Sequence, residues 1–107
     1  MPDYGEGLYI EGSRKLKGRI VIEGNRLYLS GIYGASTTYI PLEKIERLKY
    51  VRGGLEIKVK LSAANIVRAV ISLPAKDIQR LTKDLVKRLH LKKRFLKREW
   101  SGEVAWR

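Results

Sequence analysis

Basic side chains recur at helical spacing between Ala75 and about Trp100, and this pattern predicts one long amphipathic helix. The opposite face of that helix is apolar and would pack on a core; it carries Ile78, Leu81, Leu85 and Leu89. Residues 76–98 hold ten Lys or Arg and two Asp, so +8 of the chain's net charge of +12 lies in this segment. An exposed cationic ridge of this size is typical of a protein that binds a polyanion. The stripe that forms the ridge consists of Lys76, Arg80, Lys83, Lys87, His90 and Arg94.

A second basic group lies between the first two predicted strands and consists of Arg14, Lys15, Lys17 and Arg19. We expect residues 13–18 to form a connector and Arg19 to begin the next strand. Arg and Lys hold phosphate oxygens through charge-assisted hydrogen bonds, so this group could form a phosphate site. It could equally be a solvated connector in a basic protein.

Nucleic acid is the polyanion that the helix fits best. Lysines on a rigid helix repeat about every 5–6 Å, which is comparable to the spacing of phosphates along a strand. That spacing suffices for non-specific binding, and no group for reading base edges can be identified. Some aromatic residues could stack on unpaired bases, although tyrosines on strands are more often half-buried sheet residues. These aromatic residues are Tyr28, Tyr33, Tyr39 and Trp100.

The residue types that catalysis needs are scarce. The chain has no cysteine, which excludes disulfides, thiolate metal sites and a cysteine nucleophile. Its one histidine, His90, falls in the cationic ridge, where neighbouring charges oppose its protonation. Asp77 and Asp84 are expected to pair along the helix with Arg80 and Arg88. We therefore predict a protein that is not an enzyme, with no cofactor, no metal and no small-molecule substrate.

The end of the chain is unusually apolar for a terminal extension. Residues 91–107 could fold back on the domain as an extra strand or pack on a second copy of the chain, and we favour the homodimer. Trp and Arg are common interface anchors, and a dimer would place two cationic ridges on one particle. The predicted interface residues are Phe95, Leu96, Trp100, Val104 and Trp106.

The composition predicts one globular domain that spans residues 1–107, with 44% hydrophobic residues. No apolar run approaches the roughly 20 residues that cross a bilayer, and the first residues do not resemble a signal, so we expect a cytoplasmic protein. A charged fraction of 32% with one Gln and one Met is typical of a thermophile. Thermophily explains the amount of charge but not the excess of 23 basic over 11 acidic residues.

Alternating apolar residues predict a mainly β fold of the α+β class, with about seven short antiparallel strands before the basic helix. Such a sheet would curl into a small barrel or sandwich, with the helix over an open end. The dipeptides Gly24-Asn25 and Gly53-Gly54 suit tight hairpin turns. The expected strands are residues 8–11, 19–23, 26–30, a short strand through 39–40, 46–51, 55–61 and 67–73.

Over residues 8–90 the chain resembles the pleckstrin-homology-like superfamily, including its GRAM and bacterial branches. The stretches that carry the resemblance are residues 18–22 with 25–29, residues 39–45 and residues 55–59. The resemblance implies a seven-stranded barrel or sandwich with a C-terminal helix, and basic residues that hold phosphates near the first hairpin. More loosely, the chain is similar to the first domain of the archaeal CheF-type chemotaxis adaptors, which implies protein docking. The final helix departs from many pleckstrin-homology domains because Leu81 and Leu85 stand where a Trp is common.

Together these patterns predict a non-catalytic module that binds DNA or RNA with little sequence preference. The predicted contacts are Arg14, Lys15, Lys17, Arg19, Lys76, Arg80, Lys83, Lys87 and Arg94. Two alternatives remain: a protein-interaction adaptor that uses the C-terminal extension, and a peripheral module that binds anionic lipid through residues 14–19.

Overall fold

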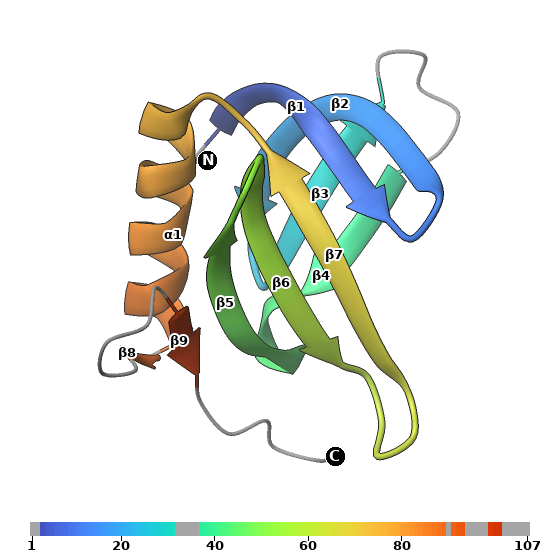
Figure 1. Cartoon of the computed structure of the whole chain (residues 1–107), viewed down its shortest axis with the longest axis vertical. Helices are drawn as coiled ribbons and strands as arrows, with labels where there is room; N and C mark the ends of the chain where they lie inside the picture. Colours follow the sequence, from blue (N-terminus) through green and yellow to red (C-terminus); the bar gives the residue numbers. More distant parts are fainter. Residues whose placement is uncertain (1–2, 32–36, 90, 94–98, 102–107) are drawn as a thin grey trace.

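The computed structural model describes residues 3–31, 37–89, 91–93 and 99–101 (Figure 1). Its elements are β1 (Asp3–Glu11), β2 (Arg14–Glu23), β3 (Arg26–Gly31), β4 (Thr37–Pro41), the 3-10 turn η1 (Leu42–Lys44), β5 (Ile45–Val51), β6 (Gly54–Lys60), β7 (Ile66–Ser72), α1 (Ala75–Leu89), β8 (Lys92–Lys93) and β9 (Glu99–Ser101). The prediction of a mainly β fold with seven antiparallel strands before a C-terminal helix is confirmed. In the described part of the chain, no helix is long and apolar enough to cross a membrane.

The strands form one sheet in the order β4-β3-β2-β1-β7-β6-β5-β9-β8, and every pairing is antiparallel. The sheet curls around its own inner face but does not close, since β4 and β8 stand at opposite ends of the order (Figure 1). β1 pairs with β2 on one side and with β7 on the other, so it joins the β2–β4 half of the sheet to the β5–β7 half. The first strand is longer than predicted and begins at Asp3.

A row of glycines crosses the sheet where β1 and β2 bend. Gly7 pairs with Gly18, which in turn pairs with Gly31 on β3. A Cβ atom at Gly18 would lie 2.3 Å from the Ser30 carbonyl oxygen, and one at Gly7 would lie 2.5 Å from the Ser72 carbonyl oxygen. The backbones therefore approach more closely than any side chain allows, which is one of the known uses of glycine within strands.

We expect Gly18→Ala to destabilise the fold, because the new methyl group must displace backbone and not the end of a flexible side chain. Overpacking of this kind costs about 1–3 kcal/mol, and more where backbone has to move. Urea unfolding followed by circular dichroism measures the loss of unfolding free energy. An unchanged unfolding midpoint would show that the strands can separate here without cost.

The inner face of the sheet holds the core, as the alternating pattern predicts. Ile20, Ile22, Leu27 and Leu29 are all buried, and together with Ile40 they cover the β2–β4 half. The buried inner residues of the β5–β7 half are Ile45, Leu48, Leu55, Ile57, Val59, Ala69 and Ile71. One face of α1 closes this core with Ile78, Leu81 and Leu85. The helix lies beside the sheet and packs against β1, β6 and η1 (Figure 1).

The helix is shorter than the sequence pattern predicts. It ends at Leu89, so the predicted extension to about Trp100 is wrong. The Leu91 N–H donates to the Val86 carbonyl oxygen at 3.2 Å, a 6→1 hydrogen bond that is typical of helix termination. Leu91 is itself buried in the core, so packing turns the chain away from the helix axis. The helix therefore carries five Lys or Arg and two Asp, a net charge of +3 and not +8.

The start of the C-terminal extension returns to the sheet. Glu99–Ser101 forms β9, whose Trp100 pairs with Leu48 on the β5 edge, and Lys92–Lys93 forms β8 beside it. This is the extra-strand alternative that the sequence left open for the extension. Of the predicted interface residues, Phe95, Leu96, Val104 and Trp106 lie outside the described residues, as do His90 and Arg94 of the predicted ridge. The homodimer stays a prediction.

Candidate polyanion-binding surface

The first basic group lies on a strand and not in a connector. The turn of the β1–β2 hairpin consists of Gly12 and Ser13, and β2 begins at Arg14. The prediction of a connector over residues 13–18 is therefore wrong. Gly12 has a φ of 61°, which lets the chain reverse within two residues, and Leu16 then continues the inward alternation of β2.

Strand alternation divides this group into two faces. Lys15, Lys17 and Arg19 are exposed on the outer face of β2, two residues apart, while Arg14 shares the parity of the inner residues. Arg14 pairs across the hairpin with Glu11. Burial raises the pKa of the Tyr9 hydroxyl on β1, and the positive charge of Arg14 opposes that rise. We call Lys15, Lys17 and Arg19 the β2 row. Its side chains follow one another at about 6.8 Å along the strand.

The second group forms a row on α1. Lys76, Arg80, Lys83 and Lys87 are exposed, while the opposite face of the helix is buried. We call these four residues the basic ridge. At 1.5 Å per residue, the ridge extends over roughly 16 Å from Lys76 to Lys87. The predicted pair of Asp77 with Arg80 is present, with 3.7 Å between Oδ1 and Nη1.

The β2 row and the basic ridge meet at Asp3. Arg19 donates to the Asp3 Oδ2 atom from both Nε, at 3.1 Å, and Nη2, at 3.0 Å. Arg80 donates from Nη2 to the Asp3 backbone oxygen at 2.9 Å. We call these three residues the Asp3 junction. Two basic groups that are 61 positions apart between Arg19 and Arg80 thus form one continuous surface.

Tyr4 fixes the strand of the junction to the helix. Its hydroxyl donates to Asp84 Oδ2, and its ring lies 5.3 Å from the guanidinium carbon of Arg80. Burial raises the pKa of the Tyr4 hydroxyl, and the hydrogen bond to Asp84 raises it further. Tyr4 therefore stays a proton donor to Asp84. No ion pair joins Asp84 to Arg88 in the described structure, so that predicted helix pair is replaced by a contact with β1.

Asp3 is a fixed anion on this basic surface. The Gly5 N–H donates to Asp3 Oδ1 at 2.8 Å, and this hydrogen bond, followed by those from Arg19, lowers the pKa of the Asp3 carboxyl below its ordinary value of 3.8. Asp3 is therefore ionised at neutral pH, and its carboxylate forms an ion pair with the guanidinium of Arg19. A phosphate at the junction would take the place that the carboxylate now holds.

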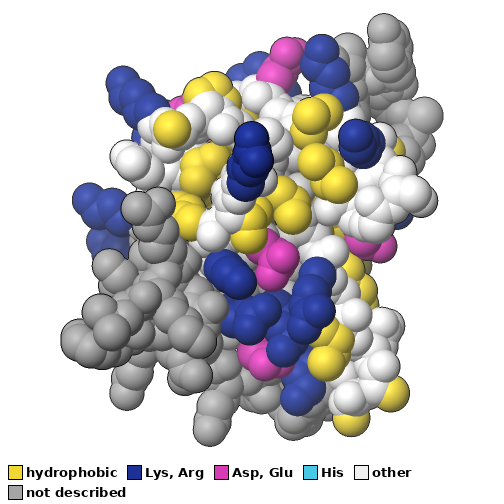
Figure 2. Space-filling model, in the orientation of Figure 1, with side chains coloured by type: hydrophobic (Ala, Val, Ile, Leu, Met, Phe, Trp, Pro, Cys, Tyr) yellow, Lys and Arg dark blue, Asp and Glu magenta, His cyan; other side chains and the backbone are white. Residues whose placement is uncertain are grey.

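A third basic surface was missed by sequence reasoning. It lies on the outer face of β5–β7, where Lys and Arg side chains gather around acidic ones (Figure 2). Arg47 lies 3.6 Å from Glu56, and Lys58 lies 3.5 Å from Glu46, so part of its charge is compensated within the sheet. The alternation of residues 55–61 indicated outward Lys58 and Lys60, but only the register brings Arg47, Lys49 and Arg68 beside them.

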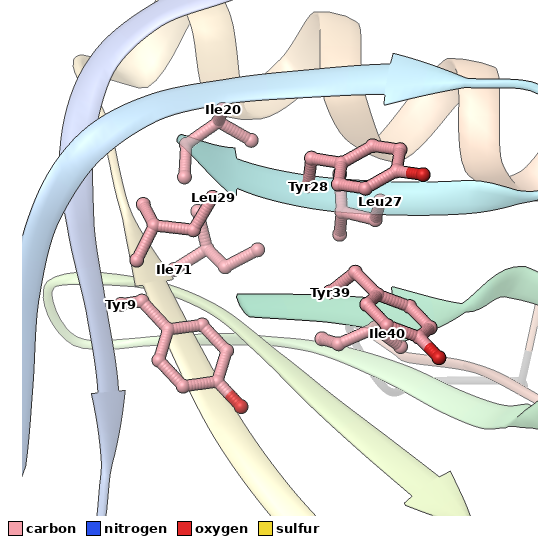
Figure 3. Close-up of a pocket in the computed structure, with 8 residues that line it drawn as sticks. All are labelled: Tyr9, Ile20, Leu27, Tyr28, Leu29, Tyr39, Ile40 and Ile71. Carbon is pink, nitrogen blue, oxygen red and sulfur yellow. The ribbon is translucent and has the colours of Figure 1, made fainter. Parts of the chain in front are cut away.

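The interior offers little room for a ligand. A small cavity lies between the two halves of the sheet, where Tyr9, Leu29 and Ile71 approach one another (Figure 3). Its volume is about 10 Å³, which is at the lower limit for holding one water molecule. The Tyr9 hydroxyl donates a hydrogen bond to Glu11 Oε1 at 2.6 Å. Among the described residues, no three His, Asp or Glu side chains gather as metal ligands would.

The strongest surface feature is thus the convergence of the β2 row and the basic ridge on Asp3. No protein family model matches this chain, and no match is found among curated proteins or among solved structures.

Proposed function

We propose that this protein is a non-catalytic module that binds nucleic acid, with little sequence preference, on the surface formed by the β2 row and the basic ridge. The observation that carries the proposal is the Asp3 junction, where Arg19 and Arg80 from distant parts of the chain hold the same residue. Two rows of exposed cations that meet at one point offer a longer track of positive charge than either row alone.

The spacing of the charges favours an extended polyanion over a small anion. Side chains of the β2 row recur at about 6.8 Å and helical neighbours of the basic ridge at about 5–6 Å. Both are similar to the distances between successive phosphates, and each Lys or Arg that contacts a phosphate releases a counterion. The excess of 23 basic over 11 acidic residues strengthens attraction at long range.

We interpret the curled sheet as a pleckstrin-homology-like barrel, open at one end and covered there by α1. The strand order and the C-terminal helix support this interpretation. Such a framework hosts several functions, so the proposed function rests on the basic surface and not on the fold.

Fluorescence anisotropy with labelled single-stranded DNA, duplex DNA and RNA across a salt series tests the proposed function. We expect log affinity to fall linearly with log salt, because binding displaces counterions from the phosphates. Absence of binding to all three probes at about 50 mM salt, where exposed charges are weakly screened, would overturn the proposal. Vesicles of anionic lipid serve as the competing polyanion, and preferential binding to them would also contradict it.

Removal of the anion at the junction should strengthen binding. In Asp3→Asn, Arg19 loses its carboxylate partner and one negative charge disappears from the surface. We expect tighter binding to duplex DNA, by about the factor of ten that one additional phosphate contact provides at low salt, together with a steeper salt dependence. Ala64→Lys, which adds one positive charge at an exposed position between β6 and β7, is the control for net charge. Equal gains in the two variants would show that the junction has no special role.

A further inference from the structure

A pair of tyrosines lies on the outer face of the sheet beside the Asp3 junction. Val21 on β2 pairs with Asp3 on one side and with Tyr28 on the other, and Tyr28 pairs with Tyr39 on β4. Directly paired residues of antiparallel strands point to the same face, so one row leads from Asp3 to both rings. With about 4.8 Å between strands, the backbone of Tyr39 lies roughly 14 Å from that of Asp3.

The two rings and an arginine form a small platform. The ring centroids of Tyr28 and Tyr39 are 5.9 Å apart, with 47° between the ring planes. The guanidinium of Arg26 lies 4.6 Å from the centroid of Tyr39, and its Nη1 is 3.4 Å from the Tyr28 hydroxyl oxygen. Figure 3 shows the two rings on neighbouring strands with their hydroxyls directed to the same side.

The platform is accessible. Tyr39 is 46% exposed, on a short strand at the edge of the sheet, so core packing does not account for it. A guanidinium stacked on a tyrosine ring is held flat and in place, and both groups are surfaces on which nucleobases stack. The sequence left open whether Tyr28 and Tyr39 stack on bases or are ordinary sheet residues. Tyr28 is half-buried, and the exposure of Tyr39 beside Arg26 favours stacking on Tyr39.

The charges around the platform separate a place for bases from a place for phosphates. Tyr28 and Tyr39 line a shallow hollow whose rim includes Glu23 and Glu43. These carboxylates repel phosphates and can accept hydrogen bonds from base N–H groups. Lys17 and Arg19 of the β2 row precede Val21 on the same face of β2, the strand next to β3. A bound strand would therefore place its phosphates on β2 and its bases over β3 and β4.

We propose that this face selects single-stranded nucleic acid by stacking unpaired bases on Tyr39 and Arg26. The inference rests on the proposed function and adds the form of nucleic acid that is preferred. In a duplex the bases are stacked on one another, so only an unpaired strand offers a free base plane beside its phosphates.

The test compares an oligothymidine of about 12 nucleotides with a duplex of similar length, a size within the range of single-strand sites. In Tyr39→Thr the ring is lost but strand propensity is kept. We expect its affinity for the oligothymidine to fall about tenfold or more, as a lost base stack predicts, with duplex affinity nearly unchanged. Tyr39→Phe keeps the ring and should retain the affinity. Ile66→Thr, at a β7 site with 45% exposure, is the matched control and should leave both affinities unchanged.

Other outcomes would overturn the inference in distinguishable ways. If wild-type protein binds both probes and Tyr39→Thr weakens neither or both equally, the platform does not select single strands, and the proposed function survives. If wild-type protein binds only the duplex, the inference of single-strand selection also fails while the proposed function survives. If it binds neither probe, the proposed function fails and the inference fails with it. Thermal unfolding of each variant by circular dichroism shows that the affinities belong to folded protein.

Discussion

The double variant Lys83→Ala/Lys87→Ala should bind duplex DNA about 100-fold more weakly than the wild-type protein at ~50 mM salt. Both lysines are exposed on the basic ridge, on the helix face opposite Leu81 and Leu85, so their removal leaves the core intact. Each lost phosphate contact makes the fall of log affinity with log salt less steep by about 0.9. Between 1 M and ~50 mM salt, that difference in steepness amounts to about a tenfold loss of affinity at ~50 mM. Anisotropy across a salt series measures both quantities.

The matched control removes two positive charges from the third basic surface. Lys49 and Arg68 are exposed on the outer face of β5–β7. Lys49→Ala/Arg68→Ala changes net charge by the same amount as the ridge variant. We expect it to lower affinity slightly through long-range attraction and to leave the salt slope unchanged. An equal loss in both double variants would mean that net charge and not the basic ridge determines binding, and a larger loss in the control would place the nucleic acid on β5–β7.

Leu81→Ala should cost about 2–5 kcal/mol of unfolding free energy, because it leaves a cavity between the helix and the sheet. Leu81 has no exposed surface and belongs to the same core cluster as Leu55 and Ile57 of β6. A domain of this size is stable by only about 5–15 kcal/mol, so the loss is a large share of the total. Guanidinium unfolding followed by circular dichroism at several wavelengths gives the free energy and shows whether helix and sheet unfold together.

Gln79→Ala is the control on the same helix. Gln79 is exposed, and surface substitutions of this kind change stability by less than about 0.5 kcal/mol. A loss below about 1 kcal/mol in Leu81→Ala would contradict the packing described here, since burial of a leucine contributes more than that. Separate transitions for helix and sheet would instead show that α1 is an independent unit and that the basic ridge can detach from the β2 row.

Much of the fold follows from local patterns. The alternation of residues 19–23 and 26–30 correctly indicates two strands and their buried residues, because side chains on a strand point to alternate faces. Gly24-Asn25 forms the predicted turn between Glu23 and Arg26. The apolar face of α1 agrees with the pattern as far as the helix extends.

Local patterns fail where a residue's role depends on a distant neighbour. The pattern predicts a turn at Gly53-Gly54, but the turn consists of Arg52 and Gly53, since Val51 pairs with Gly54 at the start of β6. Position 54 requires glycine because the strands are close there, and a Cβ would lie 2.1 Å from the Ile71 carbonyl oxygen. Residues 3–7 do not alternate because Gly5, with a φ of 88°, lies in the register shift of β1 between Asp3 and Glu6. The helix ends at Leu89 because Leu91 is buried, although the charge pattern continues past it.

The sequence by itself determined that about seven strands precede an amphipathic helix and that positive charge is in excess, because these depend on residue types and on periods of two or 3.6 residues. Only the tertiary structure decided which cations lie together. Arg19 and Arg80 both bond to Asp3 because β1 pairs with β2 and packs against the helix. Strand register places Asp3 in one row with Tyr28 and Tyr39. Such contacts arise from the curl of the sheet and the packing of α1, which no local period encodes.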